Sequence, residues 1–261
     1  MRFWGKPFND EPTDAESPSA RLSYSRIMSE TSRMPTESDA EWRASVNRLT
    51  PLVDGVEYYP ALRDALRHAR KQVFIIGWDL HTEIDLLRGE EAEKADQEED
   101  WPYRLGDLLL AAVDANKDLY IRLLIWEGSP LFIFERQHLP RMLWPWAKHP
   151  RIELVWDRDT PRLSSHHQKM VTIDDEVAFT GGMDLTAGRW DTHTHPRSDE
   201  RRQMPGLFAK ESQPYHDVNL VMDGEGAKVL GEWARERWLR ATGETIEAPE
   251  SEKDGDDPWP T

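Results

Sequence analysis

The 261-residue chain contains no cysteine. Disulfide bonds, thiolate catalysis and cysteine-ligated zinc are therefore excluded. No stretch approaches the roughly 18 apolar residues that a membrane-spanning helix requires. Residues 1–6 lead directly into polar residues and proline, so no signal peptide is expected. These absences favour a cytoplasmic protein and leave peripheral contact with a membrane open.

Basic residues are in the minority, with 33 Lys and Arg against 49 Asp and Glu, a formal charge of −16. Such a balance disfavours binding to nucleic acid or anionic lipid. The acids are concentrated, however, because residues 90–100 hold seven of them and residues 244–257 hold another seven. Without these two segments the chain has 35 acidic and 31 basic residues, so its body can accept an anionic substrate.

Three regions are predicted along the chain. Residues 1–45 are rich in Ser, Pro and acids and predict a disordered or loosely packed arm. Residues 46–241 predict one folded domain, and the overall hydrophobic fraction of 38% supplies material for its core. Residues 242–261 predict an acidic, disordered tail.

Apolar periodicity predicts helices and strands in alternation through the domain. Helices are expected at residues 56–70, 105–115 and 226–240 and within 131–147; strands are expected at 73–78, 119–126, 152–156, 165–173, 176–180 and 216–222. Residues 90–100 are expected to be a solvated loop. This order indicates an α/β fold with a central mixed sheet flanked by helices.

One short segment carries residues suited to phosphate chemistry. On a strand, His167 and Lys169 share a face, about 6.6 Å apart. Phosphodiester cleavage needs a nucleophile, an acid for the leaving oxygen and positive charge near the phosphate. An imidazole can attack phosphorus, a lysine can supply the charge without a metal, and the glycines Gly181 and Gly182 let backbone N–H groups approach a phosphate.

The arrangement of His167, Lys169 and Asp174, followed by Gly181 and Gly182, resembles the HKD motif of the phospholipase D superfamily. Segments on both sides are similar to this family in the same order, namely residues 77–84, 188–191 and 215–220. The resemblance is closest to the N-terminal, first-HKD half of phospholipase D/transphosphatidylase enzymes. It implies the fold of one half of a phospholipase D enzyme, with a central mixed β-sheet flanked by helices.

The resemblance also implies roles for individual residues. His167 would be the nucleophile, or the general acid if a partner half supplies the nucleophile, and Lys169 would hold the phosphate. Asp217 would accept a hydrogen bond from the other ring nitrogen of His167. Asp174 belongs to the catalytic motif but is expected to brace the hairpin. The residues expected to contact substrate are Gly181, Gly182, Asp184, Trp78, Glu83 and Trp190.

Several of these residues have alternative interpretations. Trp78, Trp126 and Trp190 suit either a lipid pocket or the core, and the core is at least as good an interpretation for Trp126. Glu83 either orients a catalytic group or ends a strand in solvent. His193 and His195 lie in a polar loop without a suitable carboxylate spacing, so neither a metal nor another cofactor is expected.

The chain contains no second His-x-Lys motif, whereas active members of the family use two. The resemblance therefore implies that this half pairs with a second copy or with a complementary HKD half. The expected function is hydrolysis or transphosphatidylation of a phospholipid through a phosphohistidine intermediate, with nucleic acid disfavoured as a partner. Two alternatives stay open: a single-motif nuclease that acts as a dimer, and a catalytically incomplete half-domain.

Overall fold

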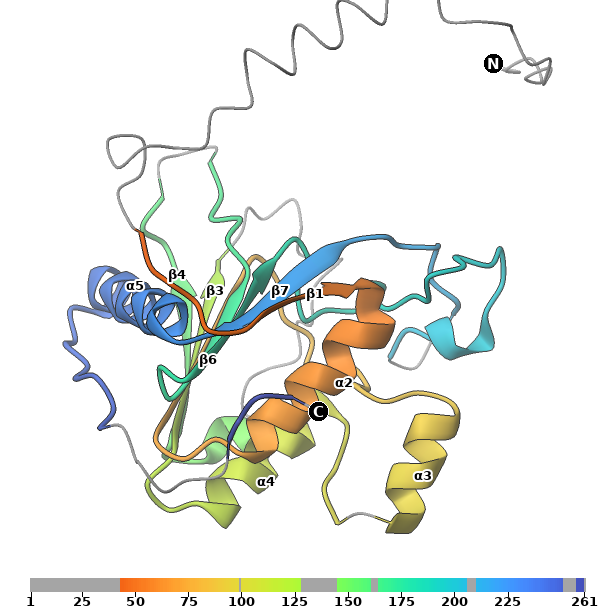
Figure 1. Cartoon of the computed structure of the whole chain (residues 1–261), viewed down its shortest axis with the longest axis horizontal. Coiled ribbons are helices and arrows are strands. Elements are labelled where there is room, and N and C mark those ends of the chain that lie inside the picture. Colours follow the sequence, from red (N-terminus) through yellow and green to blue (C-terminus); the bar gives the residue numbers. More distant parts are fainter. Residues whose placement is uncertain are drawn as a thin grey trace, which may run out of the picture. The chain divides into compact units, whose positions relative to one another are not determined.

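A seven-stranded mixed sheet forms the centre of the fold (Figure 1). Its strand order is β1-β7-β6-β5-β2-β3-β4. The computed structural model describes residues 43–98, 100–127, 145–160, 164–205, 210–250 and 257–260. The predicted α/β fold, with a central mixed sheet flanked by helices, is confirmed.

The strands are β1 (Leu49–Val53), β2 (Gln72–Gly77), β3 (Tyr120–Trp126), β4 (Ile152–Asp157), β5 (Met170–Ile173), β6 (Val177–Gly181) and β7 (Val218–Asp223). Strands β2, β3 and β4 pair in parallel, and every other neighbouring pair is antiparallel. The parallel part of the sheet is formed by nearly continuous apolar runs, as expected for strands that are covered on both faces.

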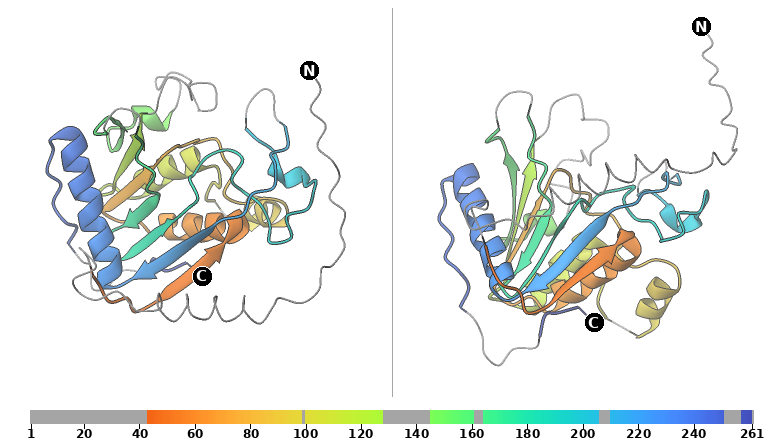
Figure 2. Two further views of the ribbon diagram at one scale, coloured as in Figure 1. Left: turned by 90° about the horizontal axis from the view of Figure 1, so that it is seen from above. Right: turned by 45° about the horizontal axis from the view of Figure 1, so that its top comes forward.

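Helices cover the two faces of this sheet, as the views in Figure 2 show. The helices are α2 (Asp54–Arg67), α3 (Glu90–Glu98), α4 (Leu105–Ala115) and α5 (Glu225–Thr242), with short 3-10 turns η4 (Trp146–Lys148) and η5 (Glu200–Arg202). Alternation along β2 divides the core: Val73 and Ile75 join the cluster that includes α2 and α4, while Phe74 and Ile76 pack with Trp238 of α5. Among the described residues, no helix is long and apolar enough to cross a bilayer.

Two elements differ from the sequence expectations. Residues 90–98 form helix α3 and not a solvated loop, although Ala95 is the one buried residue in it. Strand β1 was not expected, because it lies at the sheet edge with Pro51 in it and three of its five residues exposed. The helix expected within 131–147 lies mostly outside the described residues, as does the N-terminal arm apart from its last residues.

The acidic tail also differs from the expectation of disorder. Arg48 binds Asp257 through two hydrogen bonds of 2.7 and 2.9 Å, and its guanidinium lies 4.4 Å from the centre of the Trp259 ring. Ile246 packs on the core beside α5, and Gln72 donates to the Glu247 carbonyl at 3.2 Å. The described residues of the tail are therefore attached to the domain.

The segments that carry the HKD-like motif and its neighbours meet where four strands of the sheet begin or end. Strand β6 runs antiparallel to both β5 and β7, so the end of β6 meets the starts of β5 and β7. Strand β2 also ends there, since it is antiparallel to β5. Strand β5 starts at Met170 and not at Ser165, so His167 and Lys169 lie in the segment just before the strand.

Candidate active site

His167 lies close to these four strand ends with its side chain exposed to solvent. Its ring centre is 6.3 Å from that of Trp78, which in turn stacks on Trp126 at 5.7 Å and an interplanar angle of 27°. Within the described parts of the chain, the His167 imidazole makes no hydrogen bond or ion pair. Its exposure makes the ring accessible from solvent.

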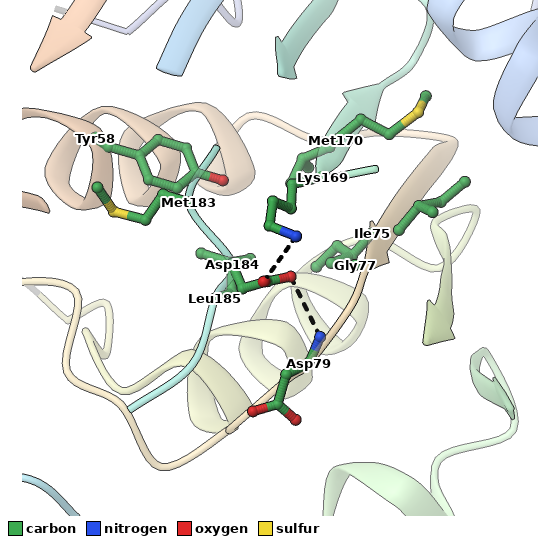
Figure 3. A pocket seen from close by; sticks show the side chains of 11 residues that line it. Tyr58, Ile75, Gly77, Asp79, Lys169, Met170, Met183, Asp184 and Leu185 are labelled. Carbon is green, nitrogen blue, oxygen red and sulfur yellow. Dashed lines mark hydrogen bonds and ion pairs between the residues drawn. The ribbon is translucent and has the colours of Figure 1, made fainter. Parts of the chain in front are cut away.

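Lys169, two residues after His167, is buried, and Figure 3 shows its ammonium group pointing at the Asp184 carboxylate. Lys169 Nζ lies 2.9 Å from the Asp184 carboxylate and donates to the His167 carbonyl at 3.2 Å. An ammonium has three donors. Among the described residues, two of them have partners, which leaves one for a phosphate oxygen.

Asp184 holds three segments together and is only 3% exposed. Besides pairing with Lys169, its Oδ1 accepts hydrogen bonds from the backbone N–H groups of Trp78 and Asp79, at 2.8 and 3.2 Å. The cavity beside this ion pair is no larger than a water molecule. The structure thus gives Asp184 a buried partner in Lys169 and not an open position toward substrate.

Gly181 and Gly182 lie at the end of β6, but their N–H groups are already used. Gly181 donates to the Lys169 carbonyl and Gly182 to the Val218 carbonyl, both at 3.3 Å. Neither glycine has a positive φ. Their small size is needed instead because a Cβ on Gly182 would lie 2.2 Å from Asp217 Oδ1. The expected phosphate contact through these N–H groups is not available in this arrangement.

Asp217 lies beside Gly182 at the start of β7, where it accepts a hydrogen bond from the Tyr215 hydroxyl at 2.9 Å. Burial together with this carboxylate raises the pKa of Tyr215 to about 12. The Arg189 guanidinium lies 4.9 Å from the Tyr215 ring centre. Among the described contacts Asp217 receives no hydrogen bond from His167, so its expected partner is replaced by Tyr215.

Asp174 lies at the opposite end of β5, away from His167. Its carboxylate accepts hydrogen bonds from the backbone N–H groups of Arg70, Lys71 and Gln72, each at 2.7 Å. Burial raises its pKa, although these three hydrogen bonds act in the opposite direction. Its contacts fasten the β5–β6 turn to the start of β2, which is a bracing role.

A network on the other side of the motif was not predicted from the sequence. His166 Nδ1 lies 2.8 Å from Arg237 of α5, and its Nε2 lies 3.4 Å from the Asp157 carboxylate. Arg237 also pairs with Asp157. These residues are far apart in sequence, so periodicity alone could not connect them. The network holds the segment that carries His167 against α5.

Two residues expected to contact substrate lie elsewhere. Trp190 is 4% exposed, and the guanidinium groups of Arg88 and Arg201 cover its ring at 5.0 and 5.2 Å. Its place is in the core, which corrects the expected substrate contact. Glu83 lines a separate, polar pocket with Arg88 and Arg104 and shares no lining residue with the cavity at Lys169.

A group with metal-ligand character lies next to Asp217. One ligand atom each from Asp54, His195 and His216 falls within 4.8 Å of the others. No local pattern connects Asp54 with the two histidines, since it precedes them by more than a hundred positions.

Comparisons with known proteins place these observations in a family. The family model "Phospholipase D" matches residues 147–254. Phospholipase D C of Dictyostelium discoideum is 27% identical over 226 residues, which are 74% of this chain and 13% of that protein. Phospholipase D2 of Bos taurus is 31% identical over 144 residues, 53% of this chain and 14% of that protein.

Among solved structures, the phospholipase D family member Nuc from Salmonella typhimurium matches 78% of this chain and 100% of its own, with 11% identity and a TM-score of 0.43. The chain spans about an eighth of the length of the first curated relatives it matches. The matched segment includes the single His-x-Lys motif at the sheet edge. Over the segment that carries this motif the chain matches the phospholipase D family, and its similarity to named phospholipases D extends over up to about three quarters of its length.

Proposed function

We propose that this chain is one half of a phospholipase D-type active site that hydrolyses or transfers a phospholipid phosphodiester. The observation that supports this most is the combination of an exposed His167 imidazole and a buried Lys169 ammonium, the first without a hydrogen bond and the second with one donor unused among the described residues. This combination places a nucleophile at the surface and fixed positive charge close to it, which is what a phosphoryl transfer requires.

The mechanism begins with attack of a His167 ring nitrogen on phosphorus. A phosphorus–nitrogen bond forms, the bond to the leaving alkoxide breaks, and an acid protonates that alkoxide. Water or an alcohol then attacks the phosphohistidine, giving back free His167 and the hydrolysed or transferred lipid. Lys169 stabilises the negative charge on the phosphate oxygens throughout.

The acid must come from outside this motif. His166 is bound between Arg237 and Asp157 and is therefore not free to protonate a leaving group. We propose that a second HKD half, from another copy or a complementary chain, supplies the second imidazole. A twofold axis between identical copies would bring two such motifs together.

A phospholipid is the proposed substrate because the curated relatives that match are named phospholipases D. The half-buried Trp78, which stacks on the buried Trp126, adds apolar surface next to His167 that suits an acyl chain. The acidic balance of the chain disfavours DNA. Contact with the surface of a phospholipid membrane is part of the same proposal.

The test uses a phosphatidyl ester of p-nitrophenol, because this leaving group departs without acid catalysis. The isolated chain should release about one equivalent of p-nitrophenolate in a burst, and mass spectrometry should find the lipid phosphoryl group on His167. His167→Ala should abolish the burst, while the exposed control His193→Ala should keep it. A burst of equal size from His167→Ala would refute the role of His167. Cleavage of single-stranded DNA without any reaction of the lipid would show that the substrate is a nucleic acid and not a phospholipid.

A further inference from the structure

The cluster of Asp54, His195 and His216 joins three separate segments. Asp54 is the first residue of α2, His195 lies in the segment between β6 and β7, and His216 comes just before β7. The Asp54 N–H donates to the Asp217 carbonyl at 2.9 Å, so the cluster is attached to the residue that directly precedes β7.

The Asp54 carboxylate is fully buried, yet one of its oxygens has no hydrogen-bond donor in the part of the chain that the structure describes. Oδ1 lies 2.7 Å from His216 Nδ1 and accepts the Asp217 N–H at 3.2 Å. Oδ2 is buried and has no hydrogen-bond partner among the described residues. An unsatisfied buried carboxylate oxygen is costly, so its position calls for a positive partner.

His195 presents a ring nitrogen to this unsatisfied oxygen at the right separation. His195 Nε2 lies 3.4 Å from Asp54 Oδ2. Two ligand atoms bound to one tetrahedral cation at about 2.1 Å are roughly 3.4 Å apart. The rings of His195 and His216 meet edge-on with centres 5.0 Å apart, so both imidazoles border the same small volume.

The far side of His195 is oriented as in a metal-binding histidine. Its Nδ1 lies 3.1 Å from the carboxylate of Asp191, which is completely buried and is itself held by Arg202. A metal-ligating histidine commonly donates its second N–H to a carboxylate, which fixes the tautomer and leaves the other nitrogen free for the metal. Here the free nitrogen is the one that faces Asp54.

We propose that Asp54, His195 and His216 form a binding site for a divalent transition-metal cation, of which Zn²⁺ is the best fit. Two imidazoles and one carboxylate are a ligand set that Zn²⁺ favours, and the exposure of His216 leaves a position open to water. At His216 the cation replaces a direct hydrogen bond to Asp54. The bound cation fastens α2, the β6–β7 segment and β7 together beside Asp217.

This proposal does not depend on the proposed function, because it rests on binding and stability. The test is Zn²⁺ titration of the EDTA-treated full chain by calorimetry, with the thermal midpoint measured in Zn²⁺ and in EDTA. The wild-type chain should bind one Zn²⁺ and melt at a higher temperature with it. Co²⁺ should give the intense visible absorption of a tetrahedral site.

The matched variants are His195→Gln and His216→Gln, with His193→Gln from the same segment as the control. Each of the first two should weaken Zn²⁺ binding by more than the 10–100-fold typical of losing an outer partner, while circular dichroism shows an unchanged fold. His193→Gln should bind as the wild type does. If the wild type takes up no Zn²⁺, or if His195→Gln and His216→Gln bind it as tightly as the control, the site is only a pair of histidine–aspartate contacts.

Discussion

The Lys169 ammonium and the Asp184 carboxylate form an ion pair at 2.9 Å in which the two side chains are only 6% and 3% exposed. The pair connects the segment before β5 to the segment after β6, and Asp184 extends the connection to the end of β2 through Trp78 and Asp79. Neutralising one member of such a pair leaves the other charge buried without compensation.

We therefore expect Asp184→Asn to lower the free energy of unfolding by about 3 kcal/mol, because Lys169 would keep its charge without a counterion. The double variant Lys169→Met/Asp184→Asn should lose less than the sum of the two single variants. Urea unfolding of all four proteins gives this comparison. Additive losses within about 0.5 kcal/mol would mean that the two side chains do not depend on each other.

Gly182 should tolerate no side chain while Asp217 keeps its carboxylate. A Cβ at Gly182 would lie 2.2 Å from Asp217 Oδ1, so Gly182→Ala must displace that carboxylate. We expect a loss of about 1–3 kcal/mol in the wild-type background and a clearly smaller one when Asp217 is already Ala. Equal losses in the two backgrounds, measured by urea unfolding, would show that the strain arises elsewhere.

Tyr215 should titrate at unusually high pH. Its pKa of about 12 means that the folded chain holds the phenolic proton more tightly than the unfolded chain, whose tyrosines titrate near 10. The resulting stabilisation is complete below pH 10 and is lost as the pH rises through about 12. The difference in tyrosinate absorbance between wild type and Tyr215→Phe should show this midpoint. In Asp217→Asn the midpoint should move down toward 10, and an unchanged midpoint would exclude the Asp217 contact as a cause.

The acidic tail should contribute to stability in spite of its composition. Deleting residues 244–261 removes the contacts of Ile246 with the core and of Asp257 and Trp259 with Arg48. We expect the thermal midpoint to fall by several degrees, equivalent to about 1–2 kcal/mol. Trp259→Ala should reproduce part of the loss. A truncated chain that melts with the wild type would show that the tail is dispensable.

The sequence predicted the parts of the fold that depend on local patterns. Strand β2 is one continuous apolar run and α4 has regular helical spacing, so both were found within a residue or two of their bounds. Helix α3 and the attachment of the tail were not predicted, because both segments are dominated by acidic residues. A composition of this kind is equally typical of a solvated loop. Trp259 is attached through Arg48, more than 200 positions earlier, and no local pattern reveals that contact.

The candidate site was predictable as a set of residues but not as a set of contacts. His167 and Lys169 were found through the resemblance to a family motif. Two contacts could not be predicted: the ion pair of Lys169 with Asp184, and the hydrogen bond from the Tyr215 hydroxyl to Asp217. Both depend on how the ends of four strands meet in the folded sheet. Trp190 was misplaced because a tryptophan after a glycine-rich turn looks the same whether it faces a pocket or the core.

The central claim is that one motif supplies only half of the chemistry, and turnover of a natural lipid ester tests it most directly. The alkoxide of choline leaves slowly without a proton donor, so the absence of the acid should lower the rate by a factor on the order of 10²–10⁴. Choline release from phosphatidylcholine vesicles should be measured on fractions whose mass is determined by light scattering, with His167→Ala and His193→Ala alongside. We predict that turnover dependent on His167 occurs only in fractions at least twice the 30.4 kDa mass of the chain, or after addition of a complementary HKD half. Sustained turnover dependent on His167 from a fraction proven to be monomeric would contradict the account.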